Sequence, residues 1–247
     1  MIQGNPIVAG GGSGEHYSGE TTAVARAEVA ESLPTAGKVM DYDVTVTPYA
    51  YQEHDNARVM FNVMKSAFTN GFDEGFDSTL MGMIGEVWDH AFVGTDGVKN
   101  LPLASCTYIG SYAFAGCLSS CTMYMPSVSY IGEGAFRSCG IEPSAFSEAF
   151  ENVEYIGDSA FAVDEAGSGV DVSLPACTYV GHFAFDNLYV SNAYLTASTV
   201  CQIESDTFRN SYDDSDALLH VFVPSSMYSQ YMSASCWSQY SGIIETI

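Results

Sequence analysis

A six-residue pattern that recurs along the chain is the feature that most constrains its fold. An aliphatic residue is followed by Gly, two variable residues, Ala and Phe, in four clear copies that begin at Ile109, Ile131, Ile156 and Val180. When two degenerate copies are included, at Val87 and Ile203, successive copies start 22, 22, 25, 24 and 23 residues apart. A period of this length predicts a solenoid, in which each repeat is too small to bury its own apolar residues and stacks on the next.

A second element keeps phase with the hexamer. Apolar-Pro pairs occur at Leu101-Pro102, Met125-Pro126, Leu174-Pro175 and Val223-Pro224. Alternating runs at 122–125, 170–174 and 219–223 lead into three of these pairs and predict short strands. The Pro ends each strand because it cannot donate to the next ladder bond. Stacked coils would join the strands into a parallel sheet.

The interior of such a solenoid can be inferred from the same register. We expect Ala and Phe of each hexamer to point inward, and the Gly to occupy a tight corner that needs unusual backbone angles. The seven cysteines contain no CxxC pair. Cys117 and Cys139 share one repeat position, and Cys106 and Cys177 share another, so we expect reduced thiols that line the core. A Cys117–Cys139 disulfide is sterically conceivable, since stacked coils lie about 4.8 Å apart.

The pattern closely resembles the BspA-like leucine-rich-repeat family, whose repeats carry an Ile-Gly-x-x-Ala-Phe-x-x-Cys signature and a Leu-Pro. The segments 113–117 and 135–139 match it, cysteine included, and the resemblance covers about residues 80–247. It implies a right-handed leucine-rich-repeat solenoid of short parallel β-strands joined by irregular or 3-10 turns, with a C-terminal helical cap. The segment 141–152 departs from the pattern and predicts one irregular coil, with a helical stretch from Ser144 to Phe150.

Four regions follow from these patterns. Residues 1–35 form a glycine-rich anchoring arm with a short helix over 21–33, and residues 36–80 form a small adaptor or N-terminal cap. Within 36–80 we expect a strand over 39–47 and an amphipathic helix from Asp55 to Phe68. Residues 81–223 form the solenoid. Residues 224–247 form its C-terminal cap, a short helix through Tyr228 and Tyr231 followed by Trp237 and Ile243.

Charge and composition argue against several functions. The chain has thirty acidic residues and only seven basic ones. This negative balance disfavours a nucleic-acid partner, because phosphates are bound by Lys and Arg. The sequence contains no apolar stretch of about 20 residues, so it does not predict a membrane-spanning segment. The start at Met1 lacks a secretory signal, so export by the general secretory route is not expected if Met1 is the native start.

The sequence also lacks recognisable catalytic chemistry. No HExxH, GxSxG or phosphate-loop pattern is present, so we expect no enzyme, no cofactor and no metal site. The acidic clusters 164–165 and 213–216 lack EF-hand spacing and are interpreted as solvated turns. His90 and His182 are interpreted as loop or surface residues.

One register repeats an aromatic residue. The residue before each clear aliphatic-Gly pair is a tyrosine: Tyr108, Tyr130, Tyr155 and Tyr179. Since the following Ile or Val must be buried, each Tyr should face outward, and stacking would align four rings. Two interpretations stay open. The rings bind a protein or glycan, or they stack on each other and stiffen the coils.

The resemblance implies adhesion or protein recognition at bacterial and host surfaces, by proteins of gut and oral bacteria and of their phages. Our leading hypothesis is a non-enzymatic component of a phage virion, a fibre, decoration or tail protein. Its N-terminal arm, which resembles docking peptides of phage structural proteins, would bind other virion proteins. Its solenoid would bind a host surface protein or glycan, and a symmetric homo-oligomer would fit this role. The alternative is a bacterial cell-surface or secreted adhesin, and an intracellular interaction scaffold is a third class.

Overall fold

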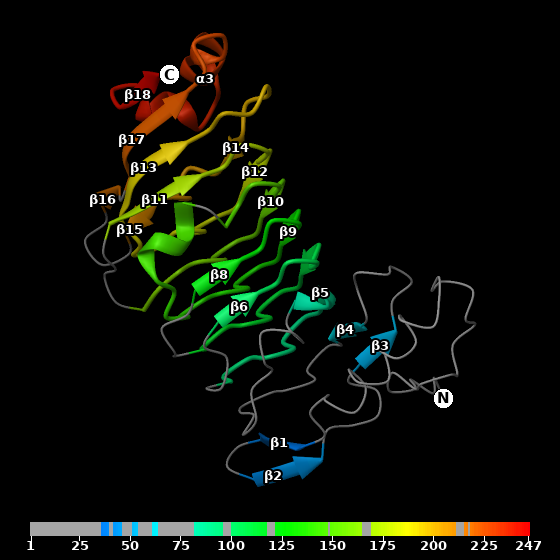
Figure 1. The fold of residues 1–247 in the computed structure, drawn as a ribbon. Coiled ribbons are helices and arrows are strands. Elements are labelled where there is room, and N and C mark those ends of the chain that lie inside the picture. The colour runs from blue at the N-terminus through cyan, green and yellow to red at the C-terminus, as the bar shows by residue number, and fades with distance from the viewer. Residues whose placement is uncertain are drawn as a thin grey trace, which may run out of the picture.

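The repeats stack into a parallel β-solenoid of about six turns, as the computed structural model in Figure 1 shows. The structure describes residues 36–39, 42–45, 51–53, 61–63, 82–95, 100–117, 122–147, 149–164, 169–210, 215–216 and 218–247. The predicted repeat solenoid with short parallel strands is therefore confirmed.

The hexamers build the longer of the parallel sheets. Its strand order is β14-β12-β10-β9-β7-β5-β4-β3. Four of these strands are Tyr-Ile or Tyr-Val dipeptides: β7 (Tyr108–Ile109), β9 (Tyr130–Ile131), β10 (Tyr155–Ile156) and β12 (Tyr179–Val180). They lie between β5 (Ile84–Val87) and β14 (Gln202–Ile203). In each dipeptide the aliphatic residue is buried and the Tyr is half-buried, because successive side chains of a strand point to opposite faces.

The apolar-Pro segments build the opposite side of the solenoid. β6 (Asn100–Pro102) pairs with β8 (Thr122–Tyr124), and β11 (Val170–Ser173), β13 (Val190–Tyr194), β17 (Leu218–Val223) and β18 (Ile244–Thr246) form a second group. The three predicted strands are confirmed. Between β8 and β11 the irregular coil contains the 3-10 helix η2 (Pro143–Ser147), in the region where a helical stretch was predicted (Figure 1).

A ladder of stacked phenylalanines fills the core, as the inward-facing Ala-Phe pairs predicted. Neighbouring ring centroids lie 5.2 to 5.7 Å apart and neighbouring ring planes differ by at most 9°. Each ring is at most 1% exposed, and burying one such side chain stabilises the fold by about 1.5–3 kcal/mol. The six rungs are Phe92, Phe114, Phe136, Phe161, Phe185 and Phe208.

The described cysteines are free, and those at the shared repeat positions lie in the core as predicted. Cys106 and Cys117 donate weak bonds to the carbonyl oxygens of Tyr108 and Phe92, at 3.3 and 3.4 Å. Burial raises the pKa of the Cys106 thiol to about 12. Cys106 therefore acts as a small apolar core residue and not as a nucleophile, and Cys117 lies in the same core.

We expected the repeat glycines to be required by unusual backbone angles, and this reason is wrong. Gly110, Gly132 and Gly157 do not have positive φ angles. A Cβ at these positions would instead lie 2.5 to 2.6 Å from a backbone nitrogen of the preceding coil. Glycine is required because the coils pass too close for any side chain.

One set of unusual backbone angles occurs two residues after the glycine position, and a second set, at Gly94, Gly116, Ser138 and Asn187, occurs six residues after it. His90, Tyr112, Gly134, Ser159 and Phe183 have φ between 53° and 58°. This turn aims the following amides along the solenoid axis. The Phe92, Phe114, Phe136 and Phe161 amides donate to carbonyl oxygens of the next coil at 2.7 to 2.8 Å. These hydrogen bonds join neighbouring coils, as the strands do. They offset the cost of about 1–2 kcal/mol for each left-handed residue other than glycine.

The described residues before the first coil include four short strands. β1 (Ala36–Val39) and β2 (Tyr42–Thr45) form an antiparallel hairpin. β2 lies within the single strand predicted over 39–47, whereas β1 ends where that predicted strand begins. β3 (Tyr51–Glu53) and β4 (Phe61–Val63) extend the long sheet.

The helix predicted from Asp55 to Phe68 is therefore wrong at Phe61–Val63. Phe61–Val63 pairs instead with the edge of β5, where the Trp88 amide donates to the Val63 carbonyl oxygen at 2.9 Å. The helical periodicity of the segment contains no information about this distant strand edge. The glycine-rich arm of residues 1–35 and its predicted helix lie outside the described residues.

The predicted helical cap covers the other end of the core. It contains α3 (Tyr228–Ser233), the 3-10 helix η3 (Trp237–Tyr240) and β18, which pairs with β17. The buried Tyr231 hydroxyl accepts a hydrogen bond from the Cys201 amide at 3.1 Å. The Trp237 indole donates to the Cys201 carbonyl oxygen at 2.6 Å. The cap thus satisfies backbone groups of the last coil that burial would otherwise leave unpaired.

Candidate binding surface

The four tyrosines of the repeat register lie side by side on the long sheet. Tyr108, Tyr130, Tyr155 and Tyr179 are direct register partners across β7, β9, β10 and β12. Their ring centroids are 4.9, 4.7 and 5.1 Å apart, and neighbouring ring planes differ by 8°, 2° and 17°. We call these four residues the tyrosine ladder.

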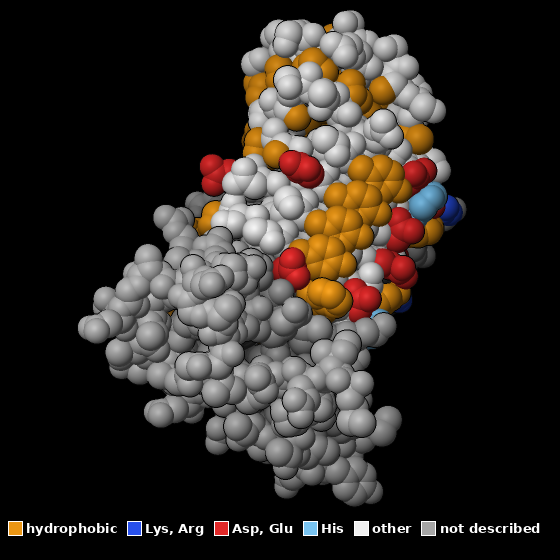
Figure 2. Space-filling model, turned by 90° about the vertical axis from the view of Figure 1, so that its right-hand side faces the viewer, with side chains coloured by type: hydrophobic (Ala, Val, Ile, Leu, Met, Phe, Trp, Pro, Cys, Tyr) orange, Lys and Arg blue, Asp and Glu red, His pale blue; other side chains and the backbone are white. Residues whose placement is uncertain are grey.

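The ladder is half-buried and faces outward. Figure 2 shows a continuous apolar stripe across this face of the molecule, with acidic side chains on both sides. The centroid distances exceed the contact distance of carbon atoms, so the nearly parallel rings are offset. Each ring therefore presents an edge and its hydroxyl to the outside while its neighbours cover most of its faces. Both interpretations of the tyrosines, binding and stiffening, require this stacking.

Burial, and after it nearby negative charge, raises the pKa of Tyr108 and Tyr155 in the ladder. Burial raises the pKa of Tyr108, and the negative charge of Asp89 raises it further. Burial is also the main cause of the raised pKa of Tyr155, where Tyr130, Asp158 and Glu133 contribute in that order. Tyr108 and Tyr155 therefore offer neutral hydroxyl groups beside negative charge at neutral pH.

At the end of the ladder nearest the C-terminal cap, the Tyr179 hydroxyl donates to Glu204 at 3.1 Å. Burial and this hydrogen bond raise its pKa to about 12. His182 lies beside this pair, with Nδ1 2.7 Å from an Asp206 oxygen, and the hydrogen bond to Asp206 raises the pKa of its imidazole. His182 is exposed, in agreement with the interpretation of this residue as a surface histidine.

At the opposite end the ladder stops at a carboxylate. Glu86 on β5 is the register partner of Tyr108, where a fifth ring would otherwise stack. Trp88, which is 40% exposed, donates its indole N–H to Glu86 at 2.9 Å. Glu86, Trp88 and Tyr108 line a shallow hollow of about 210 Å³.

The sequence did not single out Trp88, although a signal was present. In the degenerate first copy Trp88 occupies the glycine position of the hexamer. The neighbour of this coil on that side is β4 and not another repeat, so the close approach that demands glycine elsewhere does not exclude a large side chain here.

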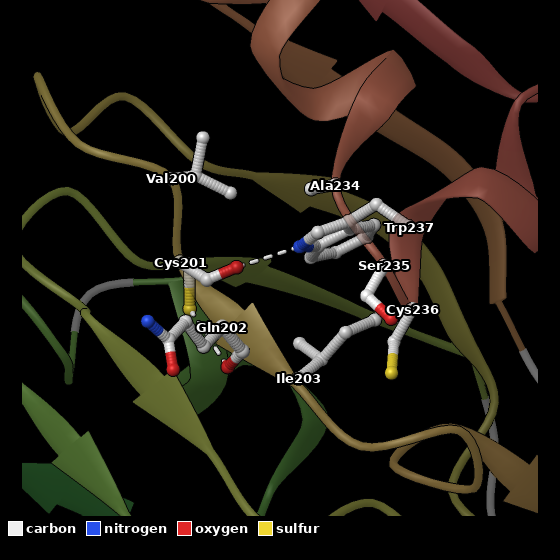
Figure 3. A pocket seen from close by; sticks show the side chains of 8 residues that line it. All are labelled: Val200, Cys201, Gln202, Ile203, Ala234, Ser235, Cys236 and Trp237. Atoms are coloured by element: carbon white, nitrogen blue, oxygen red, sulfur yellow. Dashed lines mark hydrogen bonds between the residues drawn. The ribbon is translucent and has the colours of Figure 1, made fainter.

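A second hollow lies between the last coil and the cap (Figure 3). Its volume is about 340 Å³, and the Trp237–Cys201 hydrogen bond crosses it. Its lining residues are Val200, Cys201, Gln202, Ile203, Ala234, Ser235, Cys236 and Trp237. The Cys201 thiol has a raised pKa through its hydrogen bond with Cys177 and its burial, so it is not an activated nucleophile. We interpret this hollow as the seam between solenoid and cap.

Two further features concern the acidic cluster and the membrane expectation. Ser215–Asp216 pair in antiparallel fashion with Arg209–Asn210, so the described part of the 213–216 cluster belongs to a short hairpin. Among the residues that the structure describes, no helix is long and apolar enough to cross a membrane.

These features, a capped parallel solenoid with an aromatic ladder on one sheet, place the chain in the class of repeat proteins whose stacked coils form an extended surface. A family model described as BspA type leucine-rich repeat region matches residues 85–213 in six copies. The chain belongs to this family, as the repeat signature predicted. None of the curated proteins compared with the chain matches it. The family membership supports a binding or adhesin-type protein.

Proposed function

We propose that the chain is a non-enzymatic adhesion protein whose tyrosine ladder binds a protein or glycan on a cell surface. The observation that carries this proposal is the register of four outward-facing rings on an open sheet. A ladder of this kind gives a rigid contact area, since the rings are already held in place before the ligand arrives. Tyr suits such a surface because it combines apolar area with one hydroxyl group.

The setting that we propose is a phage virion, as a fibre, decoration or tail protein. The glycine-rich residues 1–35 would bind neighbouring virion proteins, and the solenoid would face the host or its mucus. The support is the composition of the arm, in which Gly10–Gly12 and Gly14 leave little to bury. A bacterial cell-surface or secreted adhesin is the second candidate, and the family membership supports this one.

A double substitution tests the ladder. Tyr130→Ser with Tyr155→Ser removes the two central rings, so we expect loss of adhesion to intact bacterial cells and to mucin-coated wells. The matched control is Tyr194→Ser, because Tyr194 also stacks at 5.0 Å, on Phe222 of the opposite side of the solenoid. Circular dichroism and thermal unfolding establish that each variant is folded. Unchanged adhesion of a folded double variant would remove the ladder from the proposal.

The setting is tested separately. Mass spectrometry and immunogold electron microscopy of purified phage particles should detect the chain on the virion. Its absence from the particles, together with its presence in the cell envelope fraction, would favour the bacterial adhesin.

A further inference from the structure

The tyrosine ladder repeats the same chemical group at an almost constant interval. Its ring centroids are 4.9, 4.7 and 5.1 Å apart, because each ring belongs to one strand of the long sheet and neighbouring strands lie about 4.8 Å apart. A ligand that contacts all four rungs must repeat its own groups at a similar interval. An extended peptide does not, since it advances by about 3.3 Å per residue and its successive side chains point to opposite faces.

A carboxylate beside the ladder is held in a fixed position. Asp158 accepts the His182 amide at 2.9 Å with one of its oxygens. Burial is the main cause of the raised pKa of Tyr155 and of Tyr179, and the negative charge of Asp158 adds to both, which places this carboxylate near two rungs. Asp89 accepts an amide of the next coil in the same way. A carboxylate offers about four acceptor sites, so each of these side chains can accept further donors from a ligand.

These features favour a neutral carbohydrate over an anionic ligand. Sugar hydroxyl groups donate to carboxylates and exchange hydrogen bonds with tyrosine hydroxyl groups. The C–H face of a pyranose can pack against the apolar stripe in Figure 2. A sialylated, sulfated or phosphorylated ligand would instead meet the acidic side chains on both sides of the stripe and the net charge of −23 of the chain.

We propose that the tyrosine ladder binds a linear, neutral, β-1,4-linked glycan that runs along the solenoid axis with one sugar residue on each rung. The proposal rests on the adhesive function proposed above and names the class of its ligand. In such a glycan each sugar residue advances the extended chain by about 5 Å, close to the spacing of neighbouring strands. The α-1,4-linked glycan of the same sugar follows a curved path and does not keep this interval over four rungs.

Two tetrasaccharides of equal composition test the linkage. In calorimetric titrations of the full chain, cellotetraose should bind saturably, whereas maltotetraose, its α-1,4-linked isomer, should not bind. This comparison uses the unchanged protein, so it does not depend on the folding of a variant. Absence of cellotetraose binding, or equal binding of the two isomers, would overturn the proposal.

The length of the ladder sets the length of the ligand. In a series of β-1,4-linked oligomers from two to six sugars, each sugar up to the fourth should strengthen binding about fivefold, the contribution of roughly one net hydrogen bond. The fifth and sixth sugars should add little, because the ladder has four rungs. An affinity that does not depend on length, or that rises steadily to six sugars, would contradict one sugar per rung.

Substitutions in the ladder locate the site. Tyr130→Ser with Tyr155→Ser removes the two central rungs and should abolish cellotetraose binding. Tyr194→Ser removes a stacked ring from the opposite side of the solenoid and should leave the affinity unchanged. Retained binding in the folded double variant would place the sugar elsewhere and refute the proposal.

A pair of isosteric substitutions tests the carboxylate. Asp158→Asn keeps an oxygen that can accept the His182 amide but loses the charge, so we expect it to weaken cellotetraose binding about threefold. Asp171→Asn is the matched control, because Asp171 is an exposed carboxylate of the opposite side that accepts the Asn192 side chain at 2.7 Å. It should change the affinity less than about 1.5-fold. Equal effects of the two substitutions would show that Asp158 does not contact the sugar.

The adhesion assay separates this proposal from the adhesive function. If Tyr130→Ser with Tyr155→Ser loses adhesion although the unchanged chain binds no β-linked tetraose, the ladder binds a protein, and the glycan proposal fails while the adhesive function stands. If the double variant loses cellotetraose binding but adheres unchanged, the ladder is a glycan site and its adhesive function fails.

Discussion

The rings of Tyr130 and Tyr155 lie 4.7 Å apart with planes only 2° from parallel, although the irregular coil lies between them in the sequence. The two residues are register partners, and the Gly157 amide fixes this register by donating to the Ile131 carbonyl oxygen at 2.8 Å. The extra residues of this coil are accommodated on the other side, where η2 replaces a strand. The ladder side is therefore the constant side of the solenoid, which is what a preformed binding surface requires.

Gly157 should be intolerant of even a methyl group. In Gly157→Ala the new Cβ would lie 2.6 Å from the Glu133 amide nitrogen and 2.7 Å from the Gly132 carbonyl carbon, so two coils must separate. We expect a loss of about 3 kcal/mol in the free energy of unfolding, measured by urea denaturation.

The control for this substitution is Gly242→Ala in the cap. A Cβ there would meet nothing within 4 Å, and the change should stay within about 0.5 kcal/mol. A Gly157→Ala variant as stable as the control would contradict the explanation by close packing of the coils.

The hydroxyl of Tyr231 should matter more for stability than that of its neighbour on α3. Tyr231→Phe leaves the buried Cys201 amide without its hydrogen-bond acceptor, so we expect a loss of about 1–3 kcal/mol. Tyr228→Phe removes a hydroxyl from a half-buried residue of the same helix and should cost less than about 0.5 kcal/mol. Thermal unfolding of the two variants gives the comparison, and equal stabilities would contradict the sealing role of Tyr231.

Alkaline pH should weaken the fold through Tyr179. Its pKa rises from 10.0 in the unfolded chain to about 12 in the folded one, so the folded state binds the proton more tightly. The resulting stabilisation is complete below pH 10 and is lost as the pH rises through about 12. The urea midpoint should therefore fall between pH 10 and pH 12, and by less in Tyr179→Phe. An equal fall in both proteins would show that Tyr179 does not cause the effect.

The coil register could be read from the sequence because each coil obeys local rules. Alternation of Tyr with a buried Ile or Val settles which side chain points outward in β9 or β10, and the repetition aligns one Tyr above another. The cap could be predicted for the same reason, since Tyr231 and Trp237 lie within one short amphipathic segment. These features depend on residues close together in the chain.

Other features depend on contacts between residues 22 to 25 positions apart, which no local pattern contains. The reason for Gly157 is the backbone of the preceding coil at Gly132 and Glu133, and not its own φ angle. Phe61–Val63 became a strand because the edge of β5 lay beside it. The sequence by itself determined the repeat, its register and its buried faces. Only the tertiary structure decided how closely the coils approach and that Glu86 and Trp88 meet Tyr108 at the end of the ladder, because stacking alone sets those distances.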